Sequence, residues 1–280
     1  MQQLKNQLYQ GSAGRESVYD LTIPEKFNQI IVLFVHGYKG YKDWGAWQQM
    51  ENEFVAHRFG FCKFNVSHNG GTVKNPIDFP DLTAFSENRY SYEVADVNTM
   101  IDVLSAQFPK AEIVLIGHSR GGGDVLLCGK HPSVQAIITL AAISSVAYRF
   151  RHTEIIEKWQ KEGIRYELNS RTKQEMPIKY SQYVDFLEHE DELNIEEACR
   201  KLQKPCLHFH GTHDEAILLQ EGIDIATWSK SPLYILENSN HTFETSHPWN
   251  ENELSNAMIF IVGKSVELLN QLTINSLKRS

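Results

Sequence analysis

One stretch of the chain, residues 112–130, restricts the possible folds more than any other. It opens with the largely apolar run EIVLI at residues 112–116 and continues through a glycine-rich turn at residues 117–122. A second apolar run of helical length then begins at Gly123. A short apolar run bounded by glycine indicates a strand that is buried on both faces. A buried strand followed directly by a helix is typical of a parallel sheet covered by helices.

The rest of the chain repeats this alternation until residues 147–204, where it changes to charged, helical and hairpin-like pieces. We therefore expect an α/β fold with a mainly parallel central sheet and helices on both faces. Residues 1–146 and 205–280 should form the core domain, and residues 147–204 an inserted cap. The expected strands are 17–23 (an antiparallel edge strand), 30–35, 61–66, 112–116, 134–140, 205–210 and 233–236, and the clearest expected helices are 44–58, 92–108 and 253–272.

The composition argues against several classes of protein. With 27 Lys and Arg against 35 Asp and Glu, the net charge is −8 and no basic run is present, so we expect no nucleic-acid partner. The N-terminus has no secretory pattern, and the apolar run at residues 30–35 is far shorter than the roughly 20 residues that cross a bilayer. The four cysteines lack metal-site spacing and are expected to be reduced thiols. We expect a cytoplasmic protein without a membrane span, and the sequence does not indicate its oligomeric state.

The glycine-rich turn reads GHSRG over residues 117–121, with Ser119 at its centre. A serine hydroxyl becomes a nucleophile when a base lies within hydrogen-bond reach and N–H donors await the oxyanion. A GxSxG pattern between a strand and a helix is typical of a nucleophile elbow, whose small residues let the strand and the helix pass closely. The bare pattern arises often by chance, but its flanks here are the ones that the elbow requires. We therefore predict Ser119 as the nucleophile rather than part of an ordinary glycine-rich loop.

An oxyanion hole needs one N–H from the residue after the nucleophile and one from an earlier loop. Arg120 supplies the first. The strand at residues 30–35 ends in the loop HGYKG at residues 36–40, where Gly37 allows the chain to turn back and Tyr38 to present its N–H. The alternative is a plain glycine turn. The segment HNGG at residues 68–71 also follows a strand and is expected to face the cleft.

The acid and the base should follow the nucleophile in the chain, each in a loop after a strand. Asp214 follows the strand at residues 205–210, and His241 follows the last strand. Glu215 is the alternative acid and His247 the alternative base.

Two other patterns could indicate ligand sites. His208, His210 and His213 could be zinc ligands, but the first two lie within a predicted buried strand, and we interpret them as structural histidines. The three glycines at residues 121–123 lack the lysine and hydroxyl residue of a phosphate-binding loop. We expect no metal and no organic cofactor.

These motifs resemble those of the α/β-hydrolase family, and specifically its dienelactone-hydrolase-like and prolyl-oligopeptidase-like branch. The matching segments cover the chain from about residue 28 to 270 apart from the insertion, and they are HGY (36–38), GHSRGG (117–122), HGTHD (210–214) and NHTF (240–243). The resemblance implies Ser119 as nucleophile, Asp214 as acid and His241 as base. It also implies an oxyanion hole formed by the backbone N–H groups of Tyr38 and Arg120, and a lid formed by the insertion.

The resemblance also narrows the expected substrate. Dienelactone hydrolases proper carry cysteine where this chain has Ser119, and prolyl-oligopeptidase-like enzymes add a large domain that 280 residues cannot hold. We therefore expect a serine hydrolase of the carboxylic ester hydrolase class, acting on a small-molecule ester or acyl substrate. A thioesterase, a small-peptide peptidase or amidase with the same triad, and a catalytically inert binding protein on the same fold remain alternatives.

Overall fold

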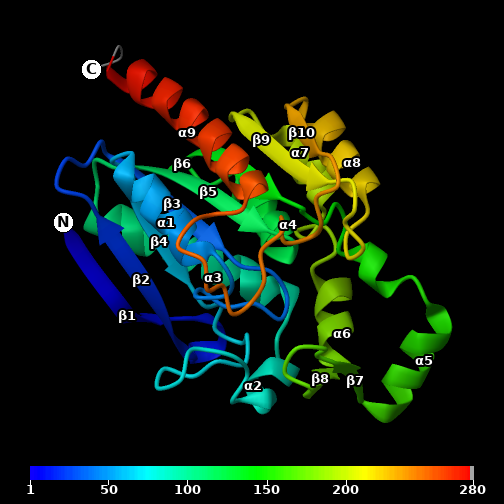
Figure 1. Ribbon diagram of the computed structural model, residues 1–280. Coiled ribbons are helices and arrows are strands. Elements are labelled where there is room, and N and C mark those ends of the chain that lie inside the picture. The colour runs from blue at the N-terminus through cyan, green and yellow to red at the C-terminus, as the bar shows by residue number, and fades with distance from the viewer. Residues whose placement is uncertain (278–280) are drawn as a thin grey trace.

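An eight-stranded sheet forms the centre of the computed structural model, which describes residues 1–277 (Figure 1). The strands run in the order β1-β2-β4-β3-β5-β6-β9-β10. The pairs β1–β2 and β2–β4 are antiparallel, and every other neighbouring pair in this sheet is parallel. Their bounds are β1 (Gln2–Gln10), β2 (Glu16–Ile23), β3 (Ile30–Val35), β4 (Gly60–Phe64), β5 (Glu112–His118), β6 (Val134–Leu140), β9 (Cys206–Gly211) and β10 (Leu233–Leu236).

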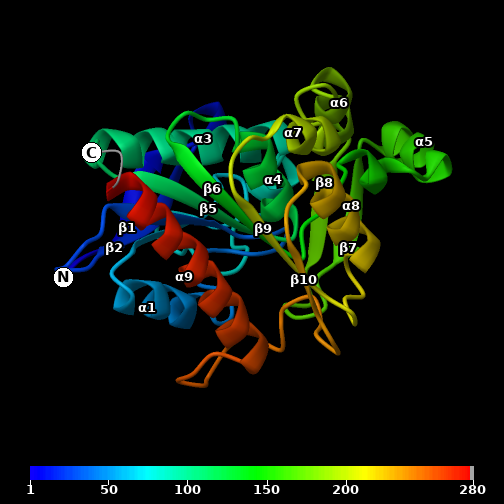
Figure 2. The same ribbon diagram turned by 90° about the horizontal axis from the view of Figure 1, so that it is seen from above.

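Helices cover both faces of this sheet (Figure 2). One face carries α1 (Trp47–Ala56) and α9 (Asn256–Leu277), and the other carries α3 (Tyr90–Gln107), α4 (Arg120–Cys128), α7 (Ile195–Lys201) and α8 (Leu219–Ser229). The sequence of β3 is continuously apolar because both of its faces are buried. Ile31 and Leu33 pack in the core under α3 and α4, whereas Val32 and Phe34 pack in the core under α1 and α9.

The inserted region lies beyond the ends of the parallel strands and beside α2 (Leu82–Ser86) (Figure 1). It contains a 3₁₀ turn (Ala147–Phe150), α5 (Thr153–Glu162), an antiparallel hairpin of β7 (Ile164–Leu168) and β8 (Glu175–Lys179), and α6 (Ser181–Glu188). Its buried side chains meet the core domain in a mostly aromatic cluster of Tyr41, Phe79, Phe85, Trp159, Met176 and Ile178. Helix α7 packs on α4 and α8, so it joins the core layer. The limits of the cap stay a prediction.

The predicted fold class is confirmed, and three details differ from the expectation. Residues 17–23 were expected at the sheet edge, which is wrong, because β1 pairs outside β2. Strand β1 is largely polar and exposed and is held by its backbone pairing, so its sequence carries little apolar signal. Helix α8 was also not among the expected helices. Helix α4 begins at Arg120, because the glycines expected in the turn form its first helical turn.

One helix of residues 1–277 is long and apolar enough to cross a membrane by length and composition alone. The segment is Asn256–Ile274 of α9, with a mean hydropathy of 1.3 and a third of it buried. Its Met258, Val262 and Leu269 pack on the sheet. Because core helices of soluble proteins pass the same test, this finding is weak evidence for a span.

Candidate active site

Ser119 lies directly after β5, at the end of the sheet where the parallel strands finish. Its backbone takes φ 58° and ψ −118°, a conformation that costs energy for any residue with a side chain. The surrounding structure holds it there. The Ser119 N–H donates to the Leu140 carbonyl at 2.8 Å, and the Ser119 carbonyl accepts from the N–H groups of Gly122 (3.0 Å) and Ile143 (3.2 Å). The serine is 9% exposed.

Two glycines allow the strand and the helix to pass closely at this turn. A Cβ atom on Gly117 would lie 2.2 Å from the Gly121 carbonyl oxygen, and one on Gly121 would lie 2.4 Å from the His36 carbonyl oxygen. Both contacts are far shorter than atoms tolerate, so the GxSxG spacing follows from packing.

Asp214 and His241 form a direct pair. His241 Nδ1 donates to Asp214 Oδ2 at 2.8 Å, and Asp214 Oδ1 accepts from the N–H groups of Ala216 (2.9 Å) and Ile217 (2.8 Å). The Asp214 carboxylate is fully buried, and the His241 ring is 23% exposed. Burial raises the pKa of the Asp214 carboxyl, but the hydrogen bonds from His210, His241 and the Ile217 backbone outweigh it and hold this pKa well below its usual range. The carboxylate is therefore ionised at neutral pH and fixes the His241 ring.

The two alternative residues lie elsewhere. The Glu215 side chain is exposed to solvent. His247 Nδ1 accepts from the Gly45 N–H at 3.0 Å, and its ring packs on Trp44 and Tyr41. The structure thus pairs Asp214 with His241. Glu215 does not pair with His241, and His247 does not pair with Asp214. The catalytic roles of these residues stay predictions.

His118 connects the nucleophile strand to the His241 loop. His118 Nε2 donates to the His241 carbonyl at 2.9 Å, and the two imidazole rings lie 4.7 Å apart. Burial, followed by the neighbouring His241, lowers the pKa of His118 to about 3, so it is neutral at physiological pH. Because His118 directly precedes Ser119, this contact holds the His241 loop against the end of β5 that leads into Ser119.

The loop after β3 lies directly against Ser119. A Cβ atom on Gly37 would lie 2.8 Å from the Ser119 Cβ. The Gly37 carbonyl accepts from the Gly40 N–H at 3.0 Å and from His36 Nδ1 at 2.9 Å. Because the C=O and N–H of a trans peptide point in opposite directions, these bonds direct the Tyr38 N–H away from the turn.

The second predicted donor is the Arg120 N–H at the start of α4. The first N–H groups of a helix have no acceptor within the helix and favour a negative charge nearby. The roles of the Tyr38 and Arg120 N–H groups as an oxyanion hole stay a prediction.

Residues 68–71 lie against the loop after β3. Asn69 Nδ2 donates to the Gly40 carbonyl at 3.2 Å, and Asn69 Oδ1 accepts from the Gly71 N–H. His68 packs against Ser67 and Tyr92. Asn69 thus supports the loop after β3, and the expectation that this segment faces the cleft stays a prediction.

The histidines of β9 have hydrogen-bonding roles. His208 bonds to the hydroxyls of Thr139 (2.8 Å) and Ser229 (3.0 Å). His210 Nε2 donates to the Ile217 carbonyl at 2.9 Å and also lies 3.4 Å from Asp214 Oδ2. Within residues 1–277 no three His, Cys, Asp or Glu side chains converge as a metal site.

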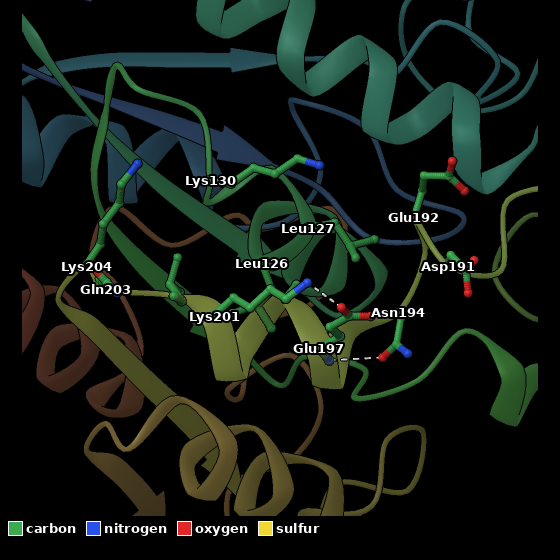
Figure 3. Close-up of a pocket in the computed structure, with 12 residues that line it drawn as sticks. Leu126, Leu127, Lys130, Asp191, Glu192, Asn194, Glu197, Lys201, Gln203 and Lys204 are labelled. Atoms are coloured by element: carbon green, nitrogen blue, oxygen red, sulfur yellow. Dashed lines mark hydrogen bonds and ion pairs between the residues drawn. The ribbon is translucent and has the colours of Figure 1, made fainter.

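A separate hollow of about 760 Å³ lies between the end of α4 and α7 (Figure 3). Its floor includes Leu126 and Leu127, and charged residues such as Lys130 and the Lys201–Glu197 pair surround it. It lies at the end of α4 opposite Ser119 and includes none of the predicted site residues.

A sequence profile of the family described as serine aminopeptidase, S33 (Hydrolase_4) matches residues 28–200, more than half of the chain. The chain belongs to this family. Among curated proteins, this S33-family chain is 24% identical over 136 residues to a monoacylglycerol lipase from Mycolicibacterium smegmatis. The match covers 48% of this chain and 44% of the lipase, so the chain spans less than half the length of that relative.

Solved structures share the fold over nearly the whole S33-family chain. Est1E from Butyrivibrio proteoclasticus, with ferulic acid bound, superposes with a TM-score of 0.68 at 16% identity, covering 96% of this chain and 100% of Est1E. A dienelactone hydrolase from Anabaena variabilis superposes with a TM-score of 0.60 at 14% identity, covering 93% and 95%. The α/β-hydrolase resemblance of the sequence is thereby confirmed.

Proposed function

We propose that this chain is a serine hydrolase that cleaves a small-molecule carboxylic ester through an acyl-enzyme on Ser119. The observation that carries the proposal is the 2.8 Å bond between His241 and the buried Asp214, formed beside a serine in a strained elbow. The names of the similar proteins support it, since a monoacylglycerol lipase and a dienelactone hydrolase both act on ester bonds.

The proposed mechanism assigns one task to each group. His241 Nδ1 is bonded to Asp214, so Nε2 is the nitrogen left to take the Ser119 proton. Ser119 attacks the ester carbonyl, and the N–H groups of Tyr38 and Arg120 stabilise the oxyanion. His241 then protonates the leaving alcohol, and water releases the acid from the acyl-enzyme by the same steps.

The carboxylates around the site bear on the choice between an ester and a peptide with a free N-terminus. An aminopeptidase must hold the substrate's ammonium group, for which a free carboxylate is the natural partner. Glu244 accepts from Ser239 and Asn240 in the His241 loop and forms no ion pair with a described cation, so it could hold an ammonium group. Three other carboxylates that contact the loops of the site are already paired with a cation. They are Glu167, which accepts from Tyr38 and pairs with Lys39 (3.2 Å), Glu221, which accepts from Ser144 and pairs with Arg149 (2.7 Å), and Asp78, which accepts from Tyr41 and pairs with Arg171.

Replacing the nucleophile tests the proposal. Ser119→Ala should lower kcat for a p-nitrophenyl ester by about 10⁴-fold or more while the thermal midpoint stays close to wild type. Ser105→Ala, on α3 and remote from the site, is the matched control and should leave the rate unchanged. Ester hydrolysis that survives in Ser119→Ala would overturn the assignment.

A substrate panel separates the remaining alternatives. We expect short acyl p-nitrophenyl esters to be cleaved faster than an acyl thioester or an aminoacyl p-nitroanilide. Faster cleavage of the anilide would indicate a peptidase. A fluorophosphonate probe should label wild type and leave Ser119→Ala unlabelled, and a wild type that is neither labelled nor active would indicate an inert binding protein.

A further inference from the structure

The side chain of Arg120 is buried beside the site, yet the mechanism uses only its backbone N–H. The side chain is 10% exposed. Its guanidinium carbon lies 4.2 Å from the Tyr38 ring centre and 4.3 Å from the Tyr90 ring centre, and Nη1 lies 3.1 Å from Glu93 Oε1. The guanidinium therefore lies between two aromatic rings and is anchored by one carboxylate.

The charges around this guanidinium are balanced. Glu93 Oε1 also accepts a hydrogen bond from Asn88 Nδ2, so this carboxylate has two donors. The neighbouring Asp124 is buried, and burial together with Glu93 raises the pKa of its carboxyl well above its usual range. Burial and Glu93 thus both favour the neutral form of Asp124, and the ion pair of the guanidinium is with Glu93.

This contact joins the two residues whose N–H groups form the predicted oxyanion hole. Tyr38 belongs to the loop after β3 and Arg120 to the start of α4, so the two are far apart in the sequence and lie on different elements. Helix α4 is fixed by the core, whereas the loop includes Lys39 at φ 57°, a conformation that an L side chain rarely adopts. The loop therefore needs an anchor, and the Tyr38 ring on the guanidinium provides one.

Stability alone gives no reason for an arginine at this place. Burying a charge has a desolvation cost, and well-packed apolar side chains often replace buried ion pairs without loss of stability. A planar cation, however, is the side chain that can lie flat on two rings at once and also bond to a carboxylate.

We propose that the Arg120 side chain is a positioning residue that holds Tyr38, so that the Tyr38 and Arg120 N–H groups converge on one oxyanion. This inference rests on the proposed function, because the oxyanion forms only if Ser119 attacks a carbonyl. Donors that shift by about 1 Å lose much of their effect on the transition state, whereas substrate binding depends on them less.

The substitution Arg120→Lys tests the proposal. Lysine keeps the positive charge near Glu93 and the backbone N–H, but its compact ammonium cannot lie flat between two rings. We expect kcat for the p-nitrophenyl ester to fall about 10- to 100-fold with KM changed less than about threefold. The affinity of a trifluoromethyl ketone, which forms the tetrahedral adduct with the serine, should fall in parallel with kcat/KM.

Arg89→Lys is the matched control. Arg89 lies over the Tyr92 ring at 5.0 Å, so the same exchange removes an arginine–tyrosine contact that touches neither Tyr38 nor Arg120. Its kcat and inhibitor affinity should equal those of wild type. An equal loss of kcat in both variants would indicate a general loosening of the fold and overturn the proposal. Wild-type kcat and inhibitor affinity in Arg120→Lys would also overturn it.

A double-mutant cycle adds an independent test. Tyr38→Leu removes the ring and keeps the N–H, so Arg120→Lys combined with Tyr38→Leu should lose no more kcat than the more damaged single variant. Fully multiplicative losses would show that the side chains act separately and overturn the proposal. If Arg120→Lys does not fold, Tyr90→Leu removes the other ring of the stack, and the same kcat loss is expected.

The two proposals fail in different ways. Wild type that neither hydrolyses esters nor reacts with the fluorophosphonate probe refutes the serine hydrolase itself. Wild type that does both, beside an Arg120→Lys variant that is equally active, refutes only the role of the Arg120 side chain.

Discussion

His118, the last residue of β5, bonds to the His241 loop and holds it against this strand. Replacing it by Phe keeps an aromatic ring against Trp47 and His241 but removes the donor to the His241 carbonyl. That carbonyl loses its hydrogen bond, and the loop becomes free to shift. A bond of this kind contributes about 1 kcal/mol, so we expect His118→Phe to lower kcat about fivefold.

Steady-state kinetics on the p-nitrophenyl ester, together with the rate of fluorophosphonate labelling, measure this effect. His189→Phe is the control, since His189 lies half exposed directly after the end of α6. Unchanged kcat and labelling rate in His118→Phe would show that His241 needs no support from this side.

The sequence allowed some of these residues to be predicted because their positions follow from chain order. Ser119, Asp214 and His241 each follow a strand, and the ends of parallel strands meet at one edge of the sheet. His118 and His210 were not predicted as parts of the site, because their role depends on which way each ring turns within a buried strand. Only the three-dimensional contacts show this.

At the scale of elements, the hairpin β7–β8 is tied to the loop after β3 through one carboxylate. Glu167 on β7 accepts from the Tyr38 hydroxyl (3.3 Å) and pairs with Lys39 (3.2 Å) and Arg165 (3.1 Å). Glu167→Gln should loosen the hairpin and lower kcat/KM severalfold. The thermal midpoint should change little, because partly exposed ion pairs contribute at most about 1 kcal/mol.

Hydrogen exchange of residues 164–179 is the direct measurement, with faster exchange expected in Glu167→Gln. Glu162→Gln removes an exposed carboxylate of α5 in the same inserted region and should leave the exchange unchanged. Equal exchange in both variants would contradict a role for Glu167 in holding the hairpin.

The elements that the sequence predicted well are those with a continuous apolar run. Strands β3, β6 and β10 have the predicted bounds. The apolar runs of β3 and β10 end at the polar residues His36 and Glu237. Strand β1 and the start of α4 were not predicted, since backbone pairing holds the first and close packing admits glycines into the second. A Cβ atom on Gly122 would lie 2.4 Å from Ala142 Cβ, so packing outweighs helix propensity there.

At the scale of the whole molecule, buried neutral histidines connect stability to pH. Burial lowers the pKa of His208 to about 4 and, with His241 as the next cause, lowers that of His118 to about 3. In the unfolded chain both titrate near pH 6.5. Below that pH these two histidines bind more protons in the unfolded chain than in the folded protein, and their contribution to the free energy of unfolding falls as the pH falls.

Above pH 6.5 these histidines are neutral in the folded protein and in the unfolded chain, so they do not affect stability there. Their destabilising effect grows as the pH falls from 6.5 towards 4. Each histidine should lower the free energy of unfolding by about 1.4 kcal/mol per pH unit within this window. The window lies above the range in which carboxyl groups with lowered pKa values, such as Asp214, take up protons.

Urea unfolding at pH 7, 6 and 5 measures the slope. His208→Gln should make the slope shallower by about 1.4 kcal/mol per pH unit, whereas His213→Gln, in an exposed loop, should not change it. The same slope in His208→Gln as in wild type would contradict the prediction.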